Sequence, residues 1–353
     1  MPATPPDGPP PTDASAHLQV SRLMDGYLAT QLLYVAAKLG IADALASGPL
    51  AADALARCVG AELDALRRVL RGLAAEGVLD ERPDGRFGLT ALGSCLRGAV
   101  SGSLRGAIIA RGDLYYGAAG GVLKAVQHGG VPFEHVHSVG FFEYLAQHPE
   151  RGAEFQASME DRSRQEAAEV VAAYDFGSFG RLVDVAGGHG LLLTGILRAA
   201  PRLQAVLLDR PPVVERARER LVAAGLAGRC EFVAGDFFEA VPPGGDAYVL
   251  SRVVHDWDDE AAVHILTNCR RAMGQGGTLL LVEAVLPERA RERPAAIRMD
   301  LHMLALLHGR ERTVAEYERL LGAAGFRLGR VVSIESPAGV SLIEAVPTAL
   351  PDH

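Results

Sequence analysis

The stretch "RLVDVAGGHG", residues 181–190, decides the fold. Leu182, Val183 and Val185 form a short apolar run typical of a strand buried on both faces, and the run passes into a turn with three glycines. Glycines at a strand-to-helix turn let backbone amides approach a ligand closely. The stretch therefore predicts the first strand of a parallel sheet, with a binding site at its carboxyl end.

Four further apolar runs follow, each separated from the next by a helical or loop segment. They are "LQAVLLD" (203–209), "CEFVAGD" (230–236), "AYVLSRVV" (247–254) and "GTLLLVEAV" (277–285). This alternation predicts an α/β domain whose parallel sheet is covered by helices on both faces. Ligands of such sheets bind beyond the carboxyl ends of the strands, so the residues just after each strand are the candidates for a site.

The N-terminal third has a different pattern. Apolar residues recur at helical spacing over 17–46, two short helical patterns follow, and "VLDERPDGRFGLT" (78–90) predicts two short strands joined by a turn. Three helices and a hairpin, in that order, are typical of a winged helix. Arginines on its third helix could contact DNA, but the same helix carries acids, so we favour a role in packing and dimerisation.

Composition limits the function further. The 353 residues carry 35 basic and 43 acidic side chains, and the net charge of −8 disfavours binding to nucleic acid or to an anionic membrane. The four cysteines lack zinc-site spacing and indicate reduced thiols in a cytoplasmic protein. We expect a disordered proline-rich tail over 1–15, a winged-helix-like dimerisation domain over 16–100, a helical linker over 101–175 and a catalytic domain over 176–353.

Three successive strand ends predict an adenosine pocket. The first offers Asp184 and the turn at Gly187, and the second ends in Asp209, where a carboxylate can bind both hydroxyls of a ribose. The third places Asp236 beside Phe237, an acceptor for an exocyclic amine next to a face for a purine ring. The glycine turn departs from the dinucleotide fingerprint, since leucine takes the final small position, so an NAD-dependent oxidoreductase is disfavoured.

At this point the sequence resembles a known family. The motifs "LVDVAGGHG", "GDFFEAVP", "VVHDWDDEAAVHIL", "LLLVEAVLP" and "GRERTVAEYERLLGAAGF" are similar, in order and approximate spacing, to those of the S-adenosylmethionine-dependent small-molecule O-methyltransferases of the caffeate and acetylserotonin type. That family includes bacterial members that act on aromatic natural products. The resemblance implies a Rossmann-like methyltransferase domain behind a winged-helix dimerisation domain, S-adenosylmethionine without a metal, a homodimer, and an aromatic phenol as acceptor.

The resemblance also implies roles for individual residues. His255 matches the general base, with Glu283 and Glu311 as flanking acids, and Asp256 competes with them to orient the histidine. The residues expected to bind the cofactor are Asp184, Gly187, Asp209, Asp236, Phe237, Ser251 and Ser163. The residues expected to line the acceptor pocket are Phe141, Phe142, Met159, Trp257, Met299 and Met303.

The chemistry agrees with a histidine at that position. A phenol with a pKa near 10 is mostly protonated at neutral pH, and a histidine with a reference pKa of about 6.5 can take its proton as the methyl group moves. Hydroxylation, decarboxylation or N-methylation on the same fold remain alternatives, as does a winged-helix regulator that senses an adenosine ligand. His255 favours proton abstraction and hence O-methylation.

Overall fold

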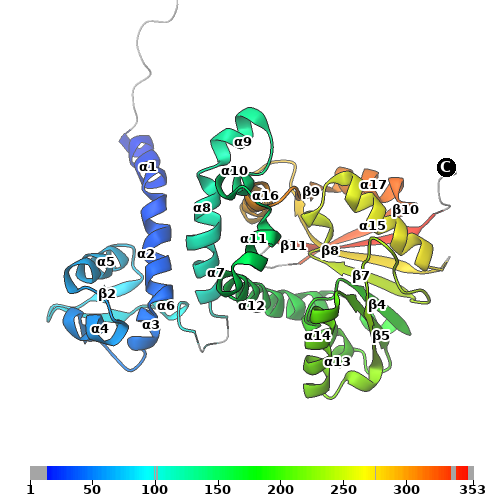
Figure 1. The fold of residues 1–353 in the computed structure, drawn as a ribbon, viewed down its shortest axis with the longest axis horizontal. Helices are drawn as coiled ribbons and strands as arrows, with labels where there is room; N and C mark the ends of the chain where they lie inside the picture. Colours follow the sequence, from blue (N-terminus) through cyan, green and yellow to red (C-terminus); the bar gives the residue numbers. More distant parts are fainter. Residues whose placement is uncertain (1–13, 99, 101, 275, 335–338, 349–353) are drawn as a thin grey trace, which may run out of the picture. The chain divides into compact units, whose positions relative to one another are not determined.

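The computed structural model describes residues 14–98, 100, 102–274, 276–334 and 339–348. Most of the predicted tail therefore lies outside the described residues. The chain folds as two compact units, Met1–Leu114 and Tyr115–His353, and Figure 1 traces the elements of each.

The first unit is a small helical domain with a three-stranded sheet. Its helices are α1 (Ala14–Met24), α2 (Gly26–Lys38), α3 (Ile41–Ala44), α4 (Ala52–Val59), α5 (Leu63–Ala75), α6 (Ala91–Ser94) and α7 (Arg105–Ala110), and its strands are β1 (Leu50–Ala51), β2 (Leu79–Glu81) and β3 (Arg86–Leu89). The hairpin predicted over 78–90 is confirmed, because β2 and β3 pair antiparallel around a turn in which Gly85 has a φ of 79°. The strand β1, which pairs with β3, was not predicted. Leu70, Leu73 and Phe87 belong to the core of this unit.

The second unit begins with short helices and one long helix. After a π-helical turn at Arg111–Tyr115, which spans the boundary between the units, come α8 (Tyr116–Ala119), α9 (Val122–His128), α10 (Pro132–His137), α11 (Phe141–Gln147) and α12 (Pro149–Ala173). The later helices are α13 (Leu191–Ala199), α14 (Pro211–Ala223), α15 (Asp259–Ala272), α16 (Pro294–Leu306) and α17 (Val314–Ala323), with 3-10 turns at Phe176–Ser178, Ala227–Arg229 and Val254–Asp256.

The large sheet lies in this second unit. Its strands are β4 (Arg181–Val185), β5 (Gln204–Asp209), β6 (Cys230–Ala234), β7 (Ala247–Ser251), β8 (Thr278–Leu286), β9 (Arg312–Thr313), β10 (Phe326–Ser333) and β11 (Val340–Pro347). They run in the order β10-β11-β8-β7-β4-β5-β6, and β9 pairs with β8. Strands β4 to β9 pair in parallel, and β11 joins β8 and β10 antiparallel. The five predicted strands are confirmed, whereas the β10–β11 hairpin was not foreseen.

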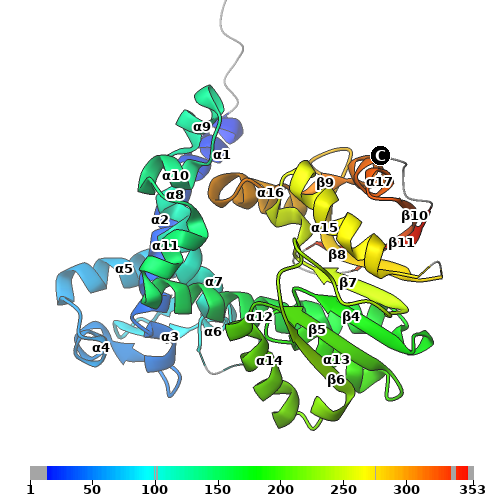
Figure 2. The same cartoon turned by 45° about the vertical axis from the view of Figure 1, so that its right-hand side comes forward.

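Both faces of the sheet are buried, as the apolar runs predicted. Val183 and Val185 of β4 pack in one cluster with residues of α15 and α17, and Leu182 of the same strand packs in the other cluster with residues of α12, α13 and α14. Alternate residues of a strand point to opposite faces, so a continuous apolar run suits this position. Figure 2 shows the helices around the sheet.

The strand order places the site. β4 lies between β5 and β7, so the chain leaves β4 for one neighbour and later returns to the other side of it. Asp184 of β4 is in register with Leu207 of β5 and Val249 of β7. The order therefore switches at β4, and ligands of open α/β sheets bind in the crevice at such a switch point.

Candidate active site

A cavity of about 430 Å³ lies at the carboxyl ends of β4, β5 and β7, with α12 along one side. Six of the predicted ligand-binding residues line it, namely Asp184, Gly187, Asp209, Ser251, Ser163 and Met159. Asp236, Phe237 and His255 are not among its lining residues. The structure thus brings together the predicted methionine and ribose ends of the cofactor site.

The glycine turn after β4 has a strained, close-packed backbone. Ala186 has a φ of 56°, a left-handed conformation that is uncommon outside glycine. A Cβ at Gly187 would lie 2.6 Å from a carboxylate oxygen of Asp184, so any other residue there would force this buried side chain to move. The backbone N–H of Gly188 donates to Oδ2 of Asp209 at 2.9 Å, and that bond fixes the carboxylate of Asp209 beside the turn.

Asp184 is a buried acid whose side chain could bind a cation. Its side chain is almost fully inaccessible, and its Oδ2 has no hydrogen-bond partner among the described residues. Burial, and then the negative charge of Asp209, raise the pKa of Asp184 to about 7. A positively charged ligand in the cavity would stabilise the ionised form, so the residues present fit a sulfonium compound that also carries an ammonium group.

Helix α12 is attached to the glycine turn by residues that the sequence did not single out. Oε1 of Glu160 lies 2.6 Å from Nδ1 of His189, and Oε2 of Glu160 lies 3.5 Å from a guanidinium nitrogen of Arg220. Glu160 and His189 both line the cavity. The sequence signal for His189 was its place between two glycines of the turn.

Asp236 and Phe237 form a separate pair at the end of β6. The exposed Asp236 accepts a bond from the backbone N–H of Phe238 at 2.8 Å, and Phe237 is partly buried. The side-chain amide of Asn268 donates to the carbonyls of Phe237 and Phe238 at 3.0 and 2.8 Å, which fixes this turn. The ring of Trp257 packs edge-on against this turn, with its centroid 6.1 Å from that of Phe237 and 4.7 Å from that of Phe238.

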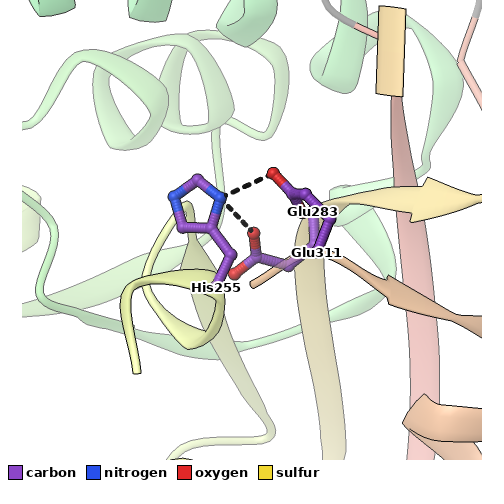
Figure 3. Close-up of side chains that lie close together, drawn as sticks. All are labelled: His255, Glu283 and Glu311. Carbon is purple, nitrogen blue, oxygen red and sulfur yellow. Dashed lines mark hydrogen bonds and ion pairs between the residues drawn. The ribbon is translucent and has the colours of Figure 1, made fainter. Parts of the chain in front are cut away.

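His255 lies on the 3-10 turn that follows β7 and is 5% exposed. Its Nδ1 lies 2.8 Å from Oε1 of Glu311 and 3.7 Å from Oε2 of Glu283, while its Nε2 lies 3.4 Å from Oδ1 of Asp256. Figure 3 shows both glutamates on the Nδ1 side of the ring. A neutral His255 that donates its Nδ1 proton to Glu311 presents the lone pair of Nε2, which is the form that a general base needs.

The two glutamates have different tasks. Oε1 of Glu283 accepts the backbone N–H groups of Val253 and Val254 at 3.1 and 2.8 Å, so Glu283 of β8 holds the turn that carries the histidine. Glu311, just before β9, makes the hydrogen bond to the ring. His255, Glu283 and Glu311 also lie close enough together to share a metal ion, but the guanidinium of Arg252 already lies 3.5 Å from Glu311 and balances its charge.

The surroundings change the basicity of the histidine. Burial has the largest effect and lowers the pKa of His255, but the negative charges of Glu283, Asp256 and Glu311 together outweigh it and raise the pKa to about 9. Burial is also the largest effect on Glu283 and raises its pKa to about 7. The site therefore contains a strong base that holds its proton at neutral pH.

A charged network joins α12 to this site. Arg252, the residue after Ser251, donates two bonds to Glu166 of α12 at 3.0 and 3.1 Å, and Arg162 donates a third at 2.7 Å. Glu166 lines the cofactor cavity. An arginine at the end of a buried strand was a signal that the sequence offered for Arg252, whereas Glu166 lies 86 residues away and had none.

Arg312 fastens the loop that carries His255. This fully buried arginine donates to the carbonyls of Val254 and Trp257 at 3.1 and 2.9 Å, on either side of the histidine, and to Oδ1 of Asp259 at 2.7 Å. Asp258 caps α15, since its side chain accepts the N–H of Ala261 at 2.9 Å. A Cβ on Gly309 would collide with the backbone oxygen of His255, so the chain must have glycine at that position.

The residues predicted for the acceptor pocket fall into groups. Phe141 is buried, and its ring packs edge-on against those of Phe133 and Phe155, whereas Phe142 is 53% exposed. Met159 lies on the cofactor cavity rather than apart from it.

Helix α16 supplies the remaining predicted pocket residues. Met299 and Met303 are buried, and the sulfur of Met299 accepts a bond from Arg162 at 3.6 Å. The neighbouring Asp300 accepts the backbone N–H of Glu311 at 3.0 Å. Helix α16 is thereby connected both to α12 and to the segment that orients the histidine.

Comparison with known proteins gives this site its context. The model of the O-methyltransferase domain matches residues 121–327, and the model of the O-methyltransferase dimerisation domain matches residues 21–98. The chain belongs to the O-methyltransferase family. It is an S-adenosylmethionine-dependent methyltransferase with the predicted α/β fold, and this excludes the oxidoreductase and regulator alternatives.

Relatives and solved structures agree over nearly the whole chain. The phenazine O-methyltransferase PhzM of Lysobacter antibioticus is 45% identical over 327 residues, which are 92% of this chain and 95% of the relative. CalO1, a methyltransferase in calicheamicin biosynthesis solved with S-adenosylhomocysteine bound, is 39% identical with a TM-score of 0.83 over 96% of this chain and 100% of that one. NcsB1, an O-methyltransferase from neocarzinostatin biosynthesis solved with S-adenosylmethionine and 2-hydroxy-5-methyl naphthoic acid, is 34% identical with a TM-score of 0.79 over 90% and 96%.

In the described parts of the chain, no helix is long and apolar enough to cross a membrane.

Proposed function

We propose that this O-methyltransferase methylates a phenolic hydroxyl of an aromatic small molecule in secondary-metabolite biosynthesis, with His255 as the general base. The observation that carries the proposal is the 2.8 Å bond between Nδ1 of the buried His255 and Glu311. The histidine follows β7 four residues after Ser251, which lines the cofactor cavity. The relatives support an aromatic acceptor, since the names of several refer to phenazine, benzoate, mitomycin and naphthoate compounds.

The residues of this chain divide the work. Bound S-adenosylmethionine supplies a methyl group on a sulfonium, which is an excellent leaving group. Asp184 and the turn at Gly187 bind the charged methionine end, and Asp209 accepts the ribose hydroxyls. Nε2 of His255 takes the phenolic proton as the oxygen is alkylated, and Glu311 stabilises the imidazolium through Nδ1. Proton removal and orientation of the acceptor are the main contributions that such a displacement requires.

Several finer assignments belong to the same proposal. Asp236 and Phe237 bind the adenine, Ser163 and Ser251 complete the cofactor site, and a pocket formed by Phe141, Phe142, Met159, Trp257, Met299 and Met303 binds the acceptor. Two exposed free thiols, Cys58 and Cys95, support a reducing cytoplasmic location. The expected division into a dimerisation domain over 16–100, a linker over 101–175 and a catalytic domain over 176–353 also stands as a proposal.

The dimerisation domain supports a homodimer. Helix α1 exposes large apolar side chains, with Leu23 at 80% and Met24 at 69% exposure, and such a face on a monomer is costly in water. Leu23→Asp should therefore lower the molar mass measured by light scattering from that of a dimer to that of a monomer. A wild-type chain that is monomeric at micromolar concentration would contradict this part of the proposal.

The main experiment is an assay of methyl transfer. The enzyme is incubated with S-adenosylmethionine and a panel of phenols, each paired with its methyl ether and its aniline, and products heavier by one methylene are detected by mass spectrometry. His255→Ala should lower kcat on the order of 10²–10⁴-fold, because general base catalysis contributes about that much. His128→Ala, at an exposed histidine of α9, is the matched control. Equal rates for wild type and His255→Ala would remove the base assignment.

A further inference from the structure

Arg252 stands between the cofactor cavity and the proposed base. Its Nε and Nη2 bind the carboxylate of Glu166, which lines the cavity, and its Nη1 lies 3.5 Å from Oε1 of Glu311. That same oxygen of Glu311 lies 2.8 Å from Nδ1 of His255. One guanidinium therefore connects a wall of the cavity to the acid that holds the histidine.

The backbone at Arg252 is strained. Its φ is 57°, a left-handed conformation that is strained for a residue with a long side chain. The conformation aims the side chain from the end of β7 toward α12, where it meets Glu166. Glu166 is buried, yet the charges of Arg162 and Arg252 overcome that burial and lower its pKa to about 2. The ion pair is therefore fully charged at every pH at which the enzyme works.

The charges around the histidine need such a cation. Three carboxylates, those of Glu283, Glu311 and Asp256, lie within 3.7 Å of its ring nitrogens. The titratable and charged groups that face this cluster are Asp256 on its own turn, Glu283 of β8, Glu311 before β9, Arg252 after β7, Arg162 and Glu166 of α12, Asp300 of α16, and Tyr317 of α17.

We infer that Arg252 is a positioning residue for methyl transfer, which balances the negative charge around His255 and holds Glu311 in line with the ring while it is anchored on the cavity wall through Glu166. The inference rests on the proposed role of His255 as base. It goes beyond that role because it states that Arg252 controls the pH at which His255 loses its proton and becomes available as a base.

The direction of the effect follows from charge. When the guanidinium is removed, the carboxylates of Glu283, Glu311 and Asp256 lose a balancing cation. Their negative charge then holds the proton on His255 more tightly, so this proton leaves at a higher pH. At an effective dielectric constant of about 20, a unit charge about 4 Å away changes a protonation equilibrium by about a thousand-fold, and one about 10 Å away still changes it by about ten-fold. A base that stays protonated to higher pH is available less often at neutral pH, so kcat at pH 7.5 should fall by about ten-fold or more.

The test compares three variants of the full chain. Arg252→Gln removes the charge, Arg252→Lys keeps a charge but loses the two-pronged bond to Glu166, and Arg162→Gln is the matched control. Arg162 shares Glu166 with Arg252, but among the described residues its ion pairs do not include Glu311. For each variant, kcat and the KM for S-adenosylmethionine are measured from pH 6 to 10.

A second readout does not depend on turnover. The Cε1–H resonance of His255 is followed by NMR as a function of pH in the enzyme without cofactor, and is assigned by its loss in His255→Gln, since the chain has 11 histidines. We expect the titration midpoint to rise in Arg252→Gln, to stay near that of wild type in Arg252→Lys, and to move clearly less in Arg162→Gln. The KM for S-adenosylmethionine should change by less than about three-fold in Arg252→Gln, because Arg162 still holds Glu166.

The outcomes separate this inference from the proposed function. An unchanged midpoint in Arg252→Gln, or equal shifts in Arg252→Gln and Arg162→Gln, would overturn the role of Arg252 while His255→Ala remained inactive. Full activity of His255→Ala would instead overturn the proposed base. If circular dichroism shows that Arg252→Gln does not fold, Arg252→Lys serves as the test. It keeps the positive charge, so a clear change in the titration midpoint of His255 in this variant would contradict charge balance by Arg252.

Discussion

Replacing Glu311 by glutamine should separate the strength of the base from its orientation. The change removes a buried negative charge 2.8 Å from Nδ1 of His255. Two effects follow. The pKa of His255, now raised to about 9 by its acidic neighbours, should fall, so the rise of kcat with pH should move to lower pH. The hydrogen bond that orients the ring also loses its charge, and bonds to charged groups are worth about 1.5–3 kcal/mol.

The second effect sets the size of the loss. At 1.36 kcal/mol for each factor of ten, the plateau of kcat above the midpoint should fall by about ten- to a hundred-fold. At neutral pH the two effects on kcat oppose each other. The lower pKa leaves more of His255 deprotonated, whereas the weaker hydrogen bond makes each deprotonated histidine less effective. The assay is therefore kcat against pH from 6 to 10, at saturating S-adenosylmethionine and phenol, with folding checked by circular dichroism.

Glu283→Gln is the matched comparison. Glu283 is the strongest of the charges that raise the pKa of His255, so its loss should also move the midpoint to lower pH. Its oxygen lies 3.7 Å from Nδ1, and a glutamine oxygen can still accept the N–H groups of Val253 and Val254, so the plateau should be nearly kept. A plateau that falls more in Glu283→Gln than in Glu311→Gln would refute the assignment of Glu311 as the orienting acid.

Three further predictions use the same structure. In the wild type, the proton must leave His255 before it can act as a base, so kcat should rise about ten-fold per pH unit between pH 6 and 8, and a flat profile would contradict this. Because Asp184, with its pKa raised to about 7, ionises over the same range, S-adenosylhomocysteine should bind more tightly at pH 8 than at pH 6 by calorimetry. In Asp184→Asn that pH dependence should disappear, and its persistence would count against Asp184 as the ligand. Arg312→Met should lower the free energy of unfolding in urea by about 1–3 kcal/mol, because it leaves the carbonyls of Val254 and Trp257 without their donor, and no measurable loss would show that the loop does not depend on it.

The sequence predicted the parts of this molecule that repeat a local pattern. Apolar runs identified the strands β4 to β8, and the end of β7 gave the position of His255. The motifs placed Glu283 and Glu311 near the histidine, but the choice between them depends on 2.8 Å against 3.7 Å, which spacing along a chain does not determine. Arg252 and Glu166 were missed because their pairing needs a left-handed backbone at one end and, at the other, a buried residue of α12 that lies 86 positions away. Local patterns contain neither.

The position of Trp257 was only partly foreseen. Trp257 was expected beside the acceptor, and the structure shows its ring against Phe237 and Phe238 at the end of β6. Trp257 lies two residues after His255 in the sequence, and its ring packs on those two phenylalanines. Whether Trp257 touches the acceptor stays a prediction.

Helix α12 has a consequence for how this enzyme could acquire new acceptors. Within two turns it supplies Glu160 and Ser163 to the cofactor cavity, and Arg162 and Glu166 to the network that reaches the base. A substitution there changes cofactor binding and proton transfer together, so most variants would lose activity before any gain in selectivity could be tested. In the contacts described above, Met303 of α16 has no such double role, so libraries of variants aimed at acceptor choice are better concentrated on Met303 than on α12.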